Sequence, residues 1–111
     1  MVEKMAFESL KVLEIVRAAN NAVYMPKAVA CGCGRAYVTL SSKNDRKTVN
    51  AVAKACKTLG LMFLRKAYGT TGNSIYIGYD NADGRALGRA EAFAAKLTEH
   101  GIPAYSDAVA D

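Results

Sequence analysis

The chain has 111 residues, of which 51% are hydrophobic, and a formal net charge of +5 at pH 7. This length provides one domain with its own core and excludes two, and the apolar content with only two prolines excludes a disordered adaptor. No apolar run reaches the ~20 residues that span a bilayer, and acidic residues interrupt the N-terminal apolar positions, so no signal peptide is predicted. The odd number of cysteines, three, predicts a reducing, cytoplasmic location.

The first part of the chain, residues 1–34, is predicted to supply a helix and an edge strand. Apolar side chains within residues 3–19 recur at helical spacing and form a broad stripe. This stripe must lie against the sheet or against a second subunit. Residues 22–31 suit an extended segment, and Pro26 restricts it to the edge of a sheet or to an irregular strand.

The rest of the chain nearly repeats itself. Residues 37–57 match residues 76–96, and each copy has a strand, a polar turn, an alanine-rich helix, a glycine and another strand. A duplicated strand–helix–strand unit is typical of the ferredoxin-like, split βαββαβ fold. We therefore predict one α+β domain over residues 1–111, with an antiparallel sheet. Its duplicated βαβ core is expected at residues 35–106, after the additional N-terminal helix and edge strand.

Within this core, glycines, capping residues and alternating apolar residues divide the chain into elements. Asn44 or Asp45 is expected to cap the first repeat helix, and Asp80 and Asp83 are expected to cap the second. The tail from Asp107 is predicted to be frayed. The predicted strands are residues 35–41, 61–68, 74–79 and 102–106, and the predicted repeat helices end near residues 59 and 100. The first and third of these strands are expected at the centre, with both repeat helices on one face.

Strand alternation predicts which side chains point to each face of the sheet. The residues expected to point toward the helices are Val38, Leu40, Ile75 and Ile77. Those expected on the opposite face are Tyr37, Thr39, Tyr76 and Gly78.

The two tyrosines on the opposite face, Tyr37 and Tyr76, allow two interpretations. Their places resemble those of the base-stacking aromatics in RNA-recognition motifs, which share this fold. The segment Asn73–Tyr79 lacks the basic, glycine and paired-aromatic pattern of that family's third strand. We favour a packing role beneath the N-terminal helix, with the hydroxyl groups at the rim, because that helix needs a surface to cover.

The basic residues are concentrated in residues 21–70, which carry nine bases and one acid. Residues 71–111 carry three bases and six acids, so the net positive charge belongs to the middle of the chain. Along the first repeat helix, polar and basic residues recur at spacings of four and three and predict an exposed face: Lys43, Lys47, Asn50, Lys54 and Lys57. Arg46, Arg65 and Lys66 are expected to extend this face.

A face that carries one sign of charge differs from the usual solvated helix face, which mixes signs. Such an array suits a phosphate backbone, because binding releases condensed counterions. An acidic protein surface would suit it as well. A plain solvated face remains a third interpretation.

Two further motifs carry weaker hypotheses. The turn Gly84–Arg89 could bind an anion through backbone amides and two arginines, but nearby acidic residues oppose this, so capping and packing are favoured. Cys31, Cys33, Cys56 and His100 do not have the spacing of a zinc site. A reactive thiol at Cys31 or Cys33, on a glycine turn, is a better interpretation than a metal ligand.

The sequence predicts no enzyme, because it has one histidine and no arrangement of a nucleophile with a base. No catalytic residue, metal or cofactor is expected. The leading hypothesis is a small binding module for nucleic acid, or for an acidic surface of a protein that handles nucleic acid. The alternative is a protein-interaction or inhibitor module, like the small phage proteins that block a host complex. Such a module would dock or form a homodimer through the apolar N-terminal helix.

Overall fold

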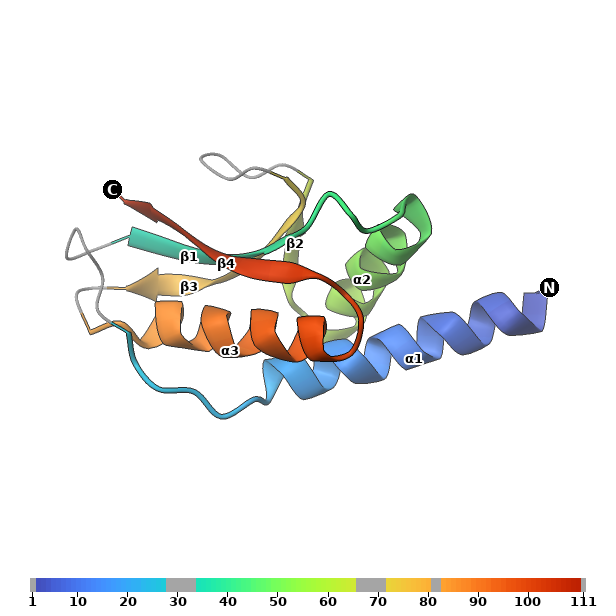
Figure 1. The fold of residues 1–111 in the computed structure, drawn as a ribbon, viewed down its shortest axis with the longest axis horizontal. Coiled ribbons are helices and arrows are strands. Elements are labelled where there is room, and N and C mark those ends of the chain that lie inside the picture. The colour runs from blue at the N-terminus through green and yellow to red at the C-terminus, as the bar shows by residue number, and fades with distance from the viewer. Residues whose placement is uncertain (1, 28–33, 66–71, 81–82, 111) are drawn as a thin grey trace.

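The computed structural model describes residues 2–27, 34–65, 72–80 and 83–110. They form an α+β structure with three helices and a four-stranded antiparallel sheet, so the predicted α+β class and antiparallel sheet are confirmed (Figure 1). Among these residues, no helix is long and apolar enough to cross a membrane. The elements are α1 (Val2–Asn20), β1 (Gly34–Leu40), α2 (Arg46–Leu59), β2 (Met62–Leu64), β3 (Ser74–Asp80), α3 (Arg85–Glu99) and β4 (Ala104–Ala110).

The strands lie in the order β2-β3-β1-β4, and every neighbouring pair is antiparallel. The prediction that β1 and β3 are central is therefore confirmed. The predicted end of the last strand at Ser106 was wrong, because β4 stays paired with β1 as far as Ala110, opposite Gly34. Asp107, expected in a frayed tail, pairs with Tyr37. The pairing satisfies backbone groups that a free tail would leave to water.

The predicted edge strand is wrong where the structure describes it. Residues 22–27 form no strand, and residues 28–31 lie outside the described residues. The segment runs along the start of α3 instead, where the Lys27 amide donates to the Gly84 carbonyl at 2.9 Å. Pro26 has no amide hydrogen to contribute to a ladder, so this segment bonds to a helix terminus rather than to the sheet.

Carboxylates accept hydrogen bonds from the first amides of both repeat helices, as predicted, although the N-cap position of α3 is Gly84. For α2, the Asp45 side chain accepts a hydrogen bond of 2.7 Å from the Thr48 amide. For α3, the buried Asp80 carboxylate accepts from the amides of Ala86 and Leu87 at 2.7 and 2.8 Å. These bonds satisfy amides that have no partner inside their helix.

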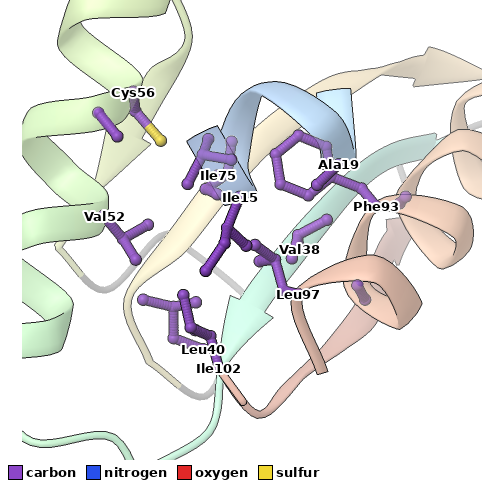
Figure 2. Close-up of a cluster of buried hydrophobic side chains, with 14 of the residues drawn as sticks. Ile15, Ala19, Val38, Leu40, Val52, Cys56, Ile75, Phe93, Leu97 and Ile102 are labelled. Carbon is purple, nitrogen blue, oxygen red and sulfur yellow. The ribbon is translucent and has the colours of Figure 1, made fainter. Parts of the chain in front are cut away.

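All three helices lie on one side of the sheet (Figure 1). The C-terminal half of α1 packs against both α2 and α3, and Figure 2 shows Ile15 between Val52 of α2 and Leu97 of α3. Val16 of α1 is completely buried in the same cluster. The prediction that both repeat helices share a face is confirmed. The prediction that α1 covers the tyrosine face was wrong, because its apolar stripe completes the helical layer instead.

A β-bulge changes the predicted alternation in β3. Ala36 pairs with Gly78 and Tyr37 pairs with Tyr76, so Ile77 is an extra residue between two pairs. Gly78 consequently faces α3, since a Cβ on it would lie 3.3 Å from the Ala86 Cβ. Its predicted place on the opposite face was therefore wrong. The remaining assignments, which place Val38, Leu40, Ile75 and Ile77 with the helices, are confirmed.

Candidate functional site

The exposed face of α2 carries the predicted basic residues. Arg46, Lys47, Asn50, Lys54 and Lys57 are all exposed. The opposite face of the helix is buried in the core through Val49, Val52, Ala55 and Cys56. The spacing of three and four residues separates the two faces, as a helical period requires.

The charges at the start of α2 are unfavourable for the helix dipole, although Lys57, in the last turn, is favourably placed. The first turn of α2 contains no acidic residue, and Arg46 and Lys47 lie at its positive end. A base in this position is unfavourable by about 0.3–1 kcal/mol. Among the described residues, no carboxylate forms an ion pair with Arg46, Lys54 or Lys57. Lys27, Arg85 and Lys96, in contrast, each pair with a carboxylate.

The structure divides the predicted basic face between two hollows. Arg46 and Arg65 line a pocket where α2 begins and β1 ends, which we call the arginine pocket. Lys47 and Lys54 line a groove between α1 and α2, which we call the lysine groove. Asn50 lies between them, since it lines the groove and binds Arg65.

The arginine pocket has a volume of about 490 Å³. Hydroxyl and amide groups accompany the two guanidinium groups, and none of the described residues that line the pocket is acidic. Its lining residues come from the end of β1 and the turn after it, from α2, from the residue after β2, from the two residues before β3 and from β4, so segments distant in sequence meet there. Its polar side chains include Ser41, Ser42, Asn44, Arg46, Arg65 and Tyr105.

Interactions of two residues, Arg65 and Asn44, fix the walls of this pocket. The Arg65 Nη2 atom donates to the Asn50 Oδ1 atom at 3.1 Å, and its guanidinium carbon lies 5.3 Å from the centre of the Phe63 ring. Asn44 donates from Nδ2 to the carbonyls of Ser41 and Pro103 at 3.0 and 2.8 Å. Arg65 is therefore oriented by its neighbours, and Asn44 ties the turn before α2 to the start of β4.

The lysine groove has a volume of about 550 Å³ and an apolar floor that includes Ile15 and Ile102. Asp45 is the acidic group among the described residues that line it. The Thr48 side chain and the Thr48 amide lower the pKa of Asp45 by hydrogen bonding, so this carboxylate is ionised at neutral pH. The basic residues of the groove are Lys11, Lys47, Lys54 and His100.

The remaining predicted site residues lie apart from these hollows. Lys43 is exposed in the turn before α2, beside the arginine pocket but not in its wall. Lys66 lies outside the described residues. Tyr37 and Tyr76 lie on the opposite face of the sheet, where their rings meet edge to face with centroids 5.6 Å apart.

The tyrosine pair does not form a stacking platform in this structure. Tyr37 is only 4% exposed, so its ring offers no face to a base. Beside it, the buried Thr39 hydroxyl bonds to the Ser74 hydroxyl at 3.0 Å and to Asp107 at 3.4 Å. Tyr37 is buried, as a packing residue would be, but α1 does not cover it, because α1 lies with the other helices on the opposite side of the sheet.

The Gly84–Arg89 turn is occupied by the protein itself. The Asp80 carboxylate takes the amides at the start of α3, which an external anion would need. Arg85 pairs with Asp83, and Arg89 donates to Asn20. These contacts support the capping and packing roles that the sequence favours for this turn.

The thiol of Cys56 is expected to be unreactive in the folded protein. Burial against the core raises its pKa to about 12, so the thiolate that attacks alkylating reagents is absent at pH 8. Peptide mapping after a short iodoacetamide treatment should find Cys56 unlabelled in buffer and labelled in urea. Equal labelling under both conditions would contradict its place in the core. Cys31 and Cys33 lie outside the described residues.

Sequence reasoning missed several residues of the two hollows. Tyr105 joins the arginine pocket because β4 pairs with β1, which places it opposite Thr39. Lys11 joins the lysine groove because α1 packs beside α2. Only the serine pair before the capping residues, Ser41 and Ser42, gave a local signal of a polar turn next to the basic helix.

In comparisons with protein-family models, with curated proteins and with solved structures, no family, sequence or structure matches this chain.

Proposed function

We propose that this protein is a small non-enzymatic module that binds nucleic acid through the basic surface of α2. The observation that carries the proposal is a group of bases on α2 and just after β2 that have no carboxylate partner among the described residues: Arg46, Lys54, Lys57 and Arg65. They lie on or beside a single helix, next to two concave surfaces. A phosphate backbone is the polyanion that rewards such an arrangement without needing a defined sequence.

The position of these arginine and lysine side chains supports contact with phosphates rather than with nucleobases. Arg46 and Lys57 are separated by three turns of α2, about 16 Å at 1.5 Å per residue. This span is comparable to that of a few consecutive phosphates on one strand. The aromatic residue at the centre of the sheet, Tyr37, is buried, so base stacking on it contributes nothing to the proposal. An acidic surface of a partner protein is the alternative polyanion for the same site.

We also infer that the fold is ferredoxin-like, a split βαββαβ core with an added N-terminal helix. The two units β1-α2-β2 and β3-α3-β4 and the strand order β2-β3-β1-β4 support this inference. The fold hosts many unrelated activities, so the function rests on the charged surface and not on the architecture.

The test is a fluorescence anisotropy titration of labelled single- and double-stranded oligonucleotides at two salt concentrations. The double variant Lys54→Glu/Lys57→Glu should weaken binding at least tenfold at low salt. The slope of log affinity against log salt concentration should fall by about two, because two phosphate contacts are lost.

The matched control is Arg85→Glu/Lys96→Glu, which changes the net charge by the same amount on α3. Both of these bases already have carboxylate partners. The control should reduce binding less than threefold, as expected for loss of long-range attraction alone. Equal losses in the two variants would reject a defined site on α2. Absence of binding at low salt would reject the nucleic-acid proposal and favour a search for an acidic protein partner.

A further inference from the structure

We propose that the arginine pocket binds the terminal phosphate of a nucleic-acid strand. This inference rests on the proposed function, and it assigns to one end of the basic surface a separate role. The strand would end in the pocket at the start of α2 and continue along the exposed face of the helix toward Lys57.

The arginines and the lysines lie in different parts of the basic surface, as separate sites for a terminal phosphate and for the backbone require. Arg46 and Arg65 line the pocket, whereas the exposed helix surface beyond it carries Lys54 and Lys57. An arginine presents a planar fork of donors that binds two oxygens of one phosphate. A lysine is a point charge that follows a backbone without fixing its geometry. Two forks in one hollow therefore suit a single group with several charged oxygens.

A terminal phosphate differs from a backbone phosphate in charge and in access. A phosphate monoester carries close to two negative charges at pH 7, one more oxygen charge than a diester. It also stands at the end of a chain, so it can enter a hollow that an unbroken backbone must pass over. The volume of about 490 Å³ has room for a phosphate together with the nucleoside that bears it.

Neutral donors complete the pocket. The Ser41 hydroxyl accepts from the Lys43 amide at 3.2 Å, which leaves its hydrogen to donate, and the hydroxyl of Ser42 lies in the same wall. The nearest opposing charge in sequence is Asp45, but this carboxylate lies in the lysine groove and bonds to Thr48. The pocket therefore offers positive charge and hydroxyl donors on its described surface, with no carboxylate in its wall.

The experiment compares oligonucleotides of one sequence that carry a 5′-phosphate, a 3′-phosphate or hydroxyl groups at both ends. We expect one phosphorylated end to raise affinity about tenfold over the hydroxyl form, as for a charge-assisted hydrogen-bond pair. The double variant Arg46→Gln/Arg65→Gln should abolish this preference. Lys54→Gln/Lys57→Gln should weaken all three oligonucleotides equally and keep the preference.

The outcomes separate this inference from the proposed function. If all three oligonucleotides bind equally to the wild-type protein, the phosphate pocket is rejected while nucleic-acid binding stands. If none binds at low salt, both are rejected. Competition by inorganic phosphate and by a nucleoside monophosphate shows whether the phosphate alone is recognised or the phosphate together with its nucleoside. Failure of both to compete with the phosphorylated end at millimolar concentration would also reject the pocket, because its ligand is the phosphate itself.

Discussion

Val16→Glu is expected to destabilise the protein strongly. Val16 is completely buried in the core where α1 packs against α2 and α3. A glutamate there must either ionise without a partner or remain protonated in an apolar site, at a cost of about 4 kcal/mol or more. Small domains have a total stability of roughly 5–15 kcal/mol, so a loss of this size removes a large part of it. Urea titration followed by circular dichroism measures the effect.

Leu10→Glu is the matched control on the same helix. Leu10 is 61% exposed, so this substitution should change the free energy of unfolding by about 0.5 kcal/mol or less. The pair also tests the alternative that α1 docks on a partner or forms a homodimer. If α1 is an interface at Leu10, light scattering should show a change of mass in this folded variant. Retention of full stability by Val16→Glu would contradict the position of α1 in the core.

Gly88→Ala is expected to destabilise the protein by about 2–3 kcal/mol. An added Cβ would lie 2.1 Å from the Met25 carbonyl oxygen and 3.1 Å from the Pro26 Cα atom. Both neighbours are backbone, so the segment 22–27 must move away from α3. Helix propensity alone predicts the opposite sign, a gain of about 1 kcal/mol for alanine. Urea titration decides the sign, and faster tryptic cleavage at Lys27 reports release of the segment.

Gly60→Ala is the control for this prediction. Gly60 ends α2 with a φ angle of 75°, but a Cβ there meets no heavy atom within 4 Å. Its substitution should cost only the 1–2 kcal/mol or so of a left-handed residue and leave cleavage at Lys27 unchanged. A more stable Gly88→Ala variant would show that segment 22–27 does not hold its place against α3.

Local sequence signals predicted most of the elements, because their causes are local. The capping carboxylate Asp45 and the glycine at residue 60 set the bounds of α2 within its own chain segment. The bulge in β3 was not predictable in this way, because it depends on how β1 and β3 are matched in register. The same is true of the continuation of β4 past Ser106, which β1 stabilises.

In the candidate site too, the sequence predicted the features that have local causes and missed those that depend on contacts between elements. The basic residues of α2 were predicted individually, since a helical period places them on its exposed face. Their grouping was not predicted: Arg65 comes to Asn50 through the packing of β2 beside α2. Tyr105 and Lys11 come from opposite ends of the chain, so no local pattern could place them beside α2.

The sequence by itself determined an α+β domain with two capped amphipathic helices and one basic helix face. These features follow from periodicity, capping and charge, which act over a few residues. The tertiary structure alone decided that α1 fills the helical layer instead of covering the tyrosine face. It also decided that the backbone of segment 22–27 packs directly against Gly88. Contacts between elements decide these points, because an apolar face can be buried against several surfaces and only packing of the whole chain selects one.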